Sequence, residues 1–145
     1  MICLTWSQIR FLMKIKSLLT LLAVFVLSSA CTQPNPYDLK LNDGERWEIN
    51  KEMVKPIERA EAALAQFQEV KATHYDLLAE ALWEQNNELI QSCTMEGEAH
   101  DELHKWLYPH MQLIDKLSKA EQLDEQKRLI SELEESFELF HEYFK

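Results

Sequence analysis

Glycine is scarce in this sequence, and the signature motifs of several enzyme classes do not occur in it. Only two of the 145 residues are glycine and four are proline. So few turn-forming residues favour long helices over a fold with many tight β-turns. No G-x-S-x-G motif, P-loop or dinucleotide-binding glycine motif is found, and no nucleophilic triad can be recognised. We therefore expect a protein that is not an enzyme.

Basic residues are also few compared with acidic residues, and they are unevenly distributed along the chain. Residues 1–30 hold three of the 15 basic residues and none of the 25 acidic residues, so the rest of the chain carries 12 basic and 25 acidic residues, a formal net charge of −13. Such a surface repels phosphate backbones and is not attracted to anionic lipid. We expect no nucleic-acid partner, and attachment to a membrane only through covalent lipid.

The basic residues near the N-terminus belong to a pattern typical of a secretory signal. Lys14 and Lys16 precede an apolar run over residues 18–27, which only Thr20 interrupts, and small residues follow at 28–30. The run is too short for a comfortable membrane span, and the order of charge, apolar run and small residues is that of a signal peptide. We expect residues 1–30 to be removed, with Met13 as the true start; a long basic region that begins at Met1 is the alternative.

The signal ends in LSSAC at residues 27–31, which resembles the lipobox of bacterial lipoproteins. Ser28 departs from the commonest form, which has leucine three places before the cysteine. The resemblance implies that Cys31 is lipidated, that the signal is cut before it, and that the protein is anchored in the bacterial cell envelope. Thr32 is similar to an outer-membrane sorting signal, which in a Gram-negative cell would leave the protein facing the periplasm. An ordinary secreted protein with a chance cysteine at the cut is the alternative.

Residues 31–49 are expected to hold the lipidated cysteine, an extended tether with Pro34 and Pro36, and a small hairpin around Asp43-Gly44.

Residues 50–145 show helical periodicity in four segments. The expected helices span about 51–70, 73–92, 98–117 and 122–144, and Asn50 and Thr73 are expected to cap the first two. Pro109 is expected to kink or split the third. We predict an all-α fold, an antiparallel helical bundle of about four helices. Its core should include both Trp83 and Trp106, with Asn86 and Asn87 solvated. The alternative is that these four residues line a pocket together with residues 92–111.

The densest cluster of metal-ligand side chains lies in residues 92–111. It contains Cys93, Met95, His100, His104, His110 and Met111. The first two histidines of this set are four residues apart and share a helix face, and Met111 falls on the same side two turns later. Thiolate and thioether donors favour Cu(I), and imidazole suits copper, zinc or haem iron. The mixture predicts a metal site that prefers copper, with zinc and haem b as alternatives.

The same residues also have ordinary structural interpretations. A histidine pair at this spacing arises by chance, Met111 and Cys93 could pack in a core, and His110 could face solvent. With Cys31 lipidated, however, Cys93 has no intramolecular disulfide partner. An unpaired thiol in an oxidising compartment favours a functional interpretation.

The run from Cys93 to His110 is similar to that of bacterial helical-bundle lipoproteins with no established activity, so this resemblance implies no mechanism. We expect a membrane-anchored envelope lipoprotein whose bundle binds a small ligand or a metal ion, copper by preference. A structural lipoprotein whose acidic face contacts an envelope protein partner is the alternative. An enzyme that uses Cys93 with His100 is the third hypothesis.

Overall fold

A computed structural model of the protein describes residues 37–145. The expected signal peptide, the lipidation of Cys31 and the tether up to residue 36 lie outside the described residues. Residues 37–145 belong to one compact unit, and its core is described below.

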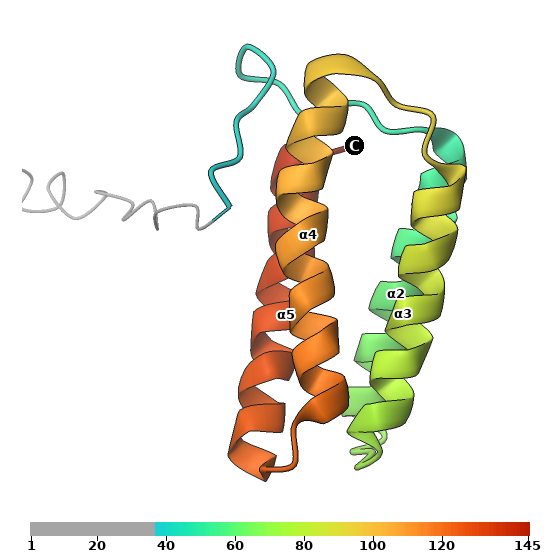
Figure 1. Cartoon of the computed structure of the whole chain (residues 1–145), viewed down its shortest axis with the longest axis vertical. Coiled ribbons are helices and arrows are strands. Elements are labelled where there is room, and N and C mark those ends of the chain that lie inside the picture. The colour runs from blue at the N-terminus through green and yellow to red at the C-terminus, as the bar shows by residue number, and fades with distance from the viewer. Residues whose placement is uncertain (1–36) are drawn as a thin grey trace, which may run out of the picture. The chain divides into compact units, whose positions relative to one another are not determined.

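Four helices make up most of the described chain, and each runs opposite to the one before it (Figure 1). They are α2 (Lys51–Glu69), α3 (Tyr75–Ser92), α4 (Gly97–Lys119) and α5 (Leu123–Tyr143). Each helix packs against the next, and α2 makes a lighter contact with α5. The links between them have three to five residues, which holds neighbours antiparallel. The expected all-α bundle is confirmed, and every helix begins and ends within two residues of its expected position.

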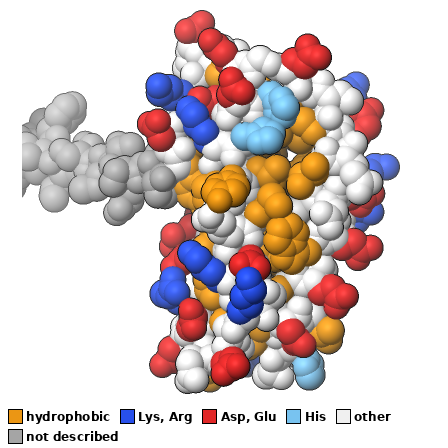
Figure 2. All heavy atoms as spheres, in the orientation of Figure 1, with side chains coloured by type: hydrophobic (Ala, Val, Ile, Leu, Met, Phe, Trp, Pro, Cys, Tyr) orange, Lys and Arg blue, Asp and Glu red, His pale blue; other side chains and the backbone are white. Residues whose placement is uncertain are grey.

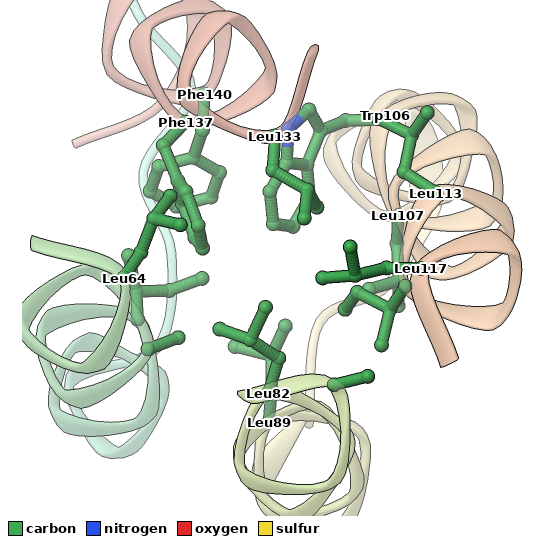
Figure 3. Close-up of a cluster of buried hydrophobic side chains, with 14 of the residues drawn as sticks. Leu64, Leu82, Leu89, Trp106, Leu107, Leu113, Leu117, Leu133, Phe137 and Phe140 are labelled. Carbon is green, nitrogen blue, oxygen red and sulfur yellow. The ribbon is translucent and has the colours of Figure 1, made fainter. Parts of the chain in front are cut away.

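The helices meet in one core because apolar side chains recur along each of them every three or four residues. In α5 the apolar stripe is buried, as Ile130, Leu133 and Phe137 show. Side chains from all four helices point into the centre of the bundle, among them Leu64, Leu82, Leu89, Leu107, Leu117, Leu133 and Phe137 (Figure 3). Ile90 of α3, next to the buried Leu89, is 43% exposed.

The buried face of α4 is broad. It includes Trp106, His110 and Leu113 in addition to Leu103, Leu107, Ile114 and Leu117, whereas Met111 is only half-buried. A helix in a four-helix bundle packs against two neighbours, so it buries a broader face than a single stripe. The helix continues from Gly97 to Lys119 through Pro109, so the expectation that this proline might split it is wrong.

The helix caps differ from those expected. Asn50 stands at the N-cap of α2, but its side chain makes no cap hydrogen bond. Its Nδ2 donates to Thr94 Oγ1 at 2.7 Å, and the Thr94 backbone N–H donates to its Oδ1 at 2.9 Å. The start of α2 is thereby joined to the link between α3 and α4. His74 and not Thr73 occupies the N-cap of α3, so that prediction is wrong.

The segment before α2 contains a tight turn at the expected place. Asn42 and Glu45 exchange backbone hydrogen bonds of 2.8 and 2.9 Å. Asp43 and Gly44 between them have φ values of 51° and 91°, and positive φ at both central residues defines a type I′ turn. The hairpin extends no further, because within residues 37–145 this pairing is a single isolated bridge.

The segment before α2 lies beside the C-terminal residues of the chain. Trp47 pairs with Phe144 in a parallel bridge. The Trp47 N–H donates to the Tyr143 carbonyl and the Lys145 N–H donates to the Trp47 carbonyl, each at 2.8 Å. These bonds hold the segment before α2 against the end of α5.

A second contact fixes this segment to α4. The buried carboxylate of Glu102 accepts the Lys40 backbone N–H at 2.8 Å and the Lys105 ammonium at 2.6 Å. The hydrogen bond from Lys105 to Glu102 raises the pKa of the lysine. An anionic side chain is thus buried with partners for both oxygens, as its desolvation requires.

Across residues 37–145, none of the helices combines the length and apolar character that crossing a bilayer would require.

Candidate functional site

A cavity of about 420 Å³ lies between the C-terminal half of α3 and the N-terminal half of α4. Its mouth is bordered by residues that are partly or largely exposed, namely Ile90, His104 and Tyr108. Its walls are completed by Met53, Leu89, Cys93, His100, Leu103, Leu107 and Met111. In Figure 2 histidine side chains border an apolar area on the front face of the bundle, with acidic side chains around them.

His100 and His104 form the polar part of this cavity. Their Nε2 atoms lie 2.8 Å apart, and their rings meet edge to face with centroids 4.5 Å apart. One nitrogen must donate the proton that the other accepts. Because the residues are one turn apart on α4, the helix itself brings the rings together. The expected common face of this pair is confirmed.

Two sulfur-bearing residues share the cavity with the histidine pair. Cys93 follows the end of α3, and Met111 lies two turns beyond His104 on the wall formed by α4. Among residues 37–145, however, no group of three or more His, Cys, Asp or Glu side chains is placed to hold a metal ion. Cys93 therefore borders the cavity without joining the two imidazoles in such a group.

His110 lies elsewhere, inside the core. Its side chain is fully buried, stacks on Trp106 with centroids 4.7 Å apart, and meets Phe137 edge to face. Its Nδ1 lies 2.9 Å from Ser136 Oγ on α5. Burial lowers the pKa of this imidazole to about 3, so the ring is neutral. The notion that it could face solvent is wrong, and it does not line the cavity.

Met95 is also separate from the cavity lining, since it packs half-buried against the core. The structure thus gathers four of the six predicted donors, Cys93, His100, His104 and Met111, around one cavity.

The polar residues of α3 were only partly predicted. Asn86 was expected to be solvated together with Asn87, but it is buried, and its Nδ2 has no hydrogen-bond partner within the described residues. Its position between Leu82 and Leu89 on the buried stripe was the available signal. Trp106 is fully buried as expected, and Trp83 is half-buried.

Sequence reasoning missed the apolar walls of the site. Leu103, Leu107, Met53 and Tyr108 all border the cavity, and none of them was among the predicted site residues. The i, i+4 relation of Tyr108 to His104 was a signal that could have placed it at the mouth.

Comparison with protein-family models, with curated protein sequences and with solved structures found no match to this chain.

Proposed function

We propose that this protein is a lipid-anchored lipoprotein of the bacterial envelope whose helical bundle binds a soft metal ion, copper first, through His100, His104 and Met111. The observation that carries this proposal is the 2.8 Å separation of the two Nε2 atoms at a cavity that Met111 also lines. Cys93 borders the same cavity as a neighbouring thiol and is not among the proposed ligands.

The spacing of the two imidazoles suits chelation of one ion. Metal–nitrogen bonds of about 2.0–2.1 Å place two ligand nitrogens about 2.8 to 3.4 Å apart for angles between a right angle and a tetrahedral one. The observed 2.8 Å is close to the lower end of that range. A metal ion would replace the proton that the two rings now share.

The donor set favours copper over the other metals considered. Structural zinc sites use four ligands, and within residues 37–145 no third His, Cys, Asp or Glu joins the imidazole pair. A thioether is a soft donor that selects Cu(I), and helical side chains lean toward the helix N-terminus, which directs Met111 toward His104. The structure suits haem binding less well, because His110, one of the predicted imidazole ligands, is packed between aromatic rings.

The charge of the molecule is consistent with a cationic ligand. With a formal net charge of −13 beyond residue 30, the surface attracts cations and repels anions. The carboxylates need not touch the metal for this effect, since the field of the whole molecule acts on ions that approach it.

Copper binding can be tested on the chain from residue 31 with Cys31→Ser, which needs no detergent and lacks the Cys31 thiol as a competing ligand. Cu(I) is supplied anaerobically as its acetonitrile complex, and bicinchoninate competes for it. We expect one equivalent to bind, and His104→Gln and Met111→Leu each to weaken binding about tenfold or more.

His74→Gln is the matched control, because His74 is exposed at the start of α3 and its loss should leave binding unchanged. Cys93→Ser should also retain the site. Binding that survives His104→Gln but disappears in Cys93→Ser would refute the proposed ligand set.

A further inference from the structure

The cavity between α3 and α4 differs in its chemistry from two other cavities lined by described residues. A cavity of about 440 Å³ beside the α2–α3 link is bordered by Lys71, Lys127 and Glu134. A smaller one of about 220 Å³ between α2 and α5 is bordered by Glu61, Glu138 and His141. The α3–α4 cavity has no Asp, Glu, Lys or Arg side chain in its lining, although 28% of the chain is charged.

The inner wall of this cavity is built from buried aliphatic side chains. Met53, Leu89, Leu103 and Leu107 are between 0% and 6% exposed, and Figure 3 shows Leu89 and Leu107 directed into the bundle from facing helices. Protein interiors contain few voids larger than a water molecule. A space of about 420 Å³ is well above the roughly 150 Å³ that suffices to hold benzene.

From these observations we propose that the α3–α4 cavity binds a neutral, largely apolar organic molecule. Its hydrocarbon or aromatic body would lie against the leucines, and a single polar group would meet the Tyr108 hydroxyl at the mouth. Sites for such ligands are concave, mostly apolar and carry few polar groups. A charged body would lose its hydration without a partner, and an anionic group would meet the acidic surface.

This proposal shares its cavity with the proposed metal site but rests on different side chains. It depends on the aliphatic wall, whereas the metal proposal depends on the imidazole nitrogens and the Met111 sulfur. The two proposals can therefore fail separately.

The test uses N-phenyl-1-naphthylamine, a neutral aromatic fluorophore, with the detergent-free Cys31→Ser chain from residue 31. We expect a saturable fluorescence increase with one site per chain. Ile90→Glu places a carboxylate at the mouth, and Leu107→Phe fills the interior. Each variant should weaken binding about tenfold or more. Ile90 is 43% exposed, so its variant tests the site even if Leu107→Phe disturbs folding.

Leu77→Glu is the matched control, since Leu77 is an exposed leucine of α3 outside the cavity, and it should bind the probe as the parent chain does. The double variant His100→Gln, His104→Gln should keep probe binding, with a change below about tenfold, while it loses copper. An absence of saturable binding, or equal binding by the Ile90→Glu and Leu77→Glu chains, would overturn the proposal.

Discussion

His110 shows how a single residue can set the acid sensitivity of the bundle. Its ring is fully buried between Trp106 and Phe137, with only Ser136 as a hydrogen-bond partner. Its Nε2 has no partner within the described residues. Charging this ring inside the core would leave an ion without hydration or a counter-charge, which is why burial lowers its pKa to about 3.

We predict that this histidine makes the folded state less stable as the pH falls below 6.5. In that range the unfolded chain takes up a proton on His110 and the folded chain does not. The free energy of unfolding therefore decreases as the pH decreases. The slope approaches about 1.4 kcal/mol per pH unit. In His110→Asn, which keeps a hydrogen-bonding group but cannot titrate, this contribution should vanish.

Urea unfolding at pH values from 5 to 7 measures the effect above the range in which ordinary carboxylates titrate. His74→Gln removes an exposed histidine as the control and should keep the slope of the parent chain. An unchanged slope in His110→Asn would show that burial of this ring does not govern the acid response.

Site residues whose contacts lie within one helix could be predicted from the sequence, and those whose contacts join distant segments could not. The contact between His100 and His104 follows from their spacing on one helix, so the sequence was sufficient. The burial of His110 depends on Ser136, which lies 26 residues away on α5. Most buried polar side chains have such a partner, and a single sequence does not show which residue it is.

At the scale of elements, the helices were predicted well and their caps were not. Periodicity over about twenty residues averages over individual side chains, so the four segments stand out. A cap depends on one side chain and its nearest donor. Asn50 finds its partners in Thr94, 44 residues later, and this pairing forms only when α2 and the α3–α4 link are assembled.

We predict that Asn50→Ala lowers the free energy of unfolding by about 1–2 kcal/mol, because two hydrogen bonds to Thr94 are lost and each contributes about 1 kcal/mol. Chemical denaturation of the detergent-free chain measures the change. Asn87→Ala is the control, since Asn87 is exposed on α3 and alanine is the better helix former. A loss in Asn87→Ala as large as that in Asn50→Ala would contradict the assignment.

The cavity is formed by the packing of helices against one another, and this explains why the sequence did not reveal it. Each leucine in its wall reads as an ordinary core residue. The space is bounded by side chains of α3 and α4, which belong to separate segments of the sequence, together with Met53 of α2. Its volume is a property of the assembled pair of helices.

For the whole molecule, we predict that membrane attachment depends on Cys31. Two or three acyl chains on this residue would hold the protein firmly, since each buried methylene contributes about 0.8 kcal/mol. The 145-residue chain, produced in a bacterium, should partition into the detergent phase of Triton X-114, and Cys31→Ser should move to the aqueous phase. Cys93→Ser is the matched cysteine control and should behave as the unmodified protein does. Equal partition of all three would exclude a lipid on Cys31.

The parallel pairing of Trp47 with Phe144 makes the entry and exit of the bundle close neighbours, at the end where α3 passes into α4 (Figure 1). A fluorescent donor fused after Lys145 would therefore sit near Cys93, the free cysteine found in residues 37–145. With an acceptor dye on that thiol, energy transfer between donor and acceptor would report the distance between the end of α5 and the end of α3. No new labelling position would be required in the bundle.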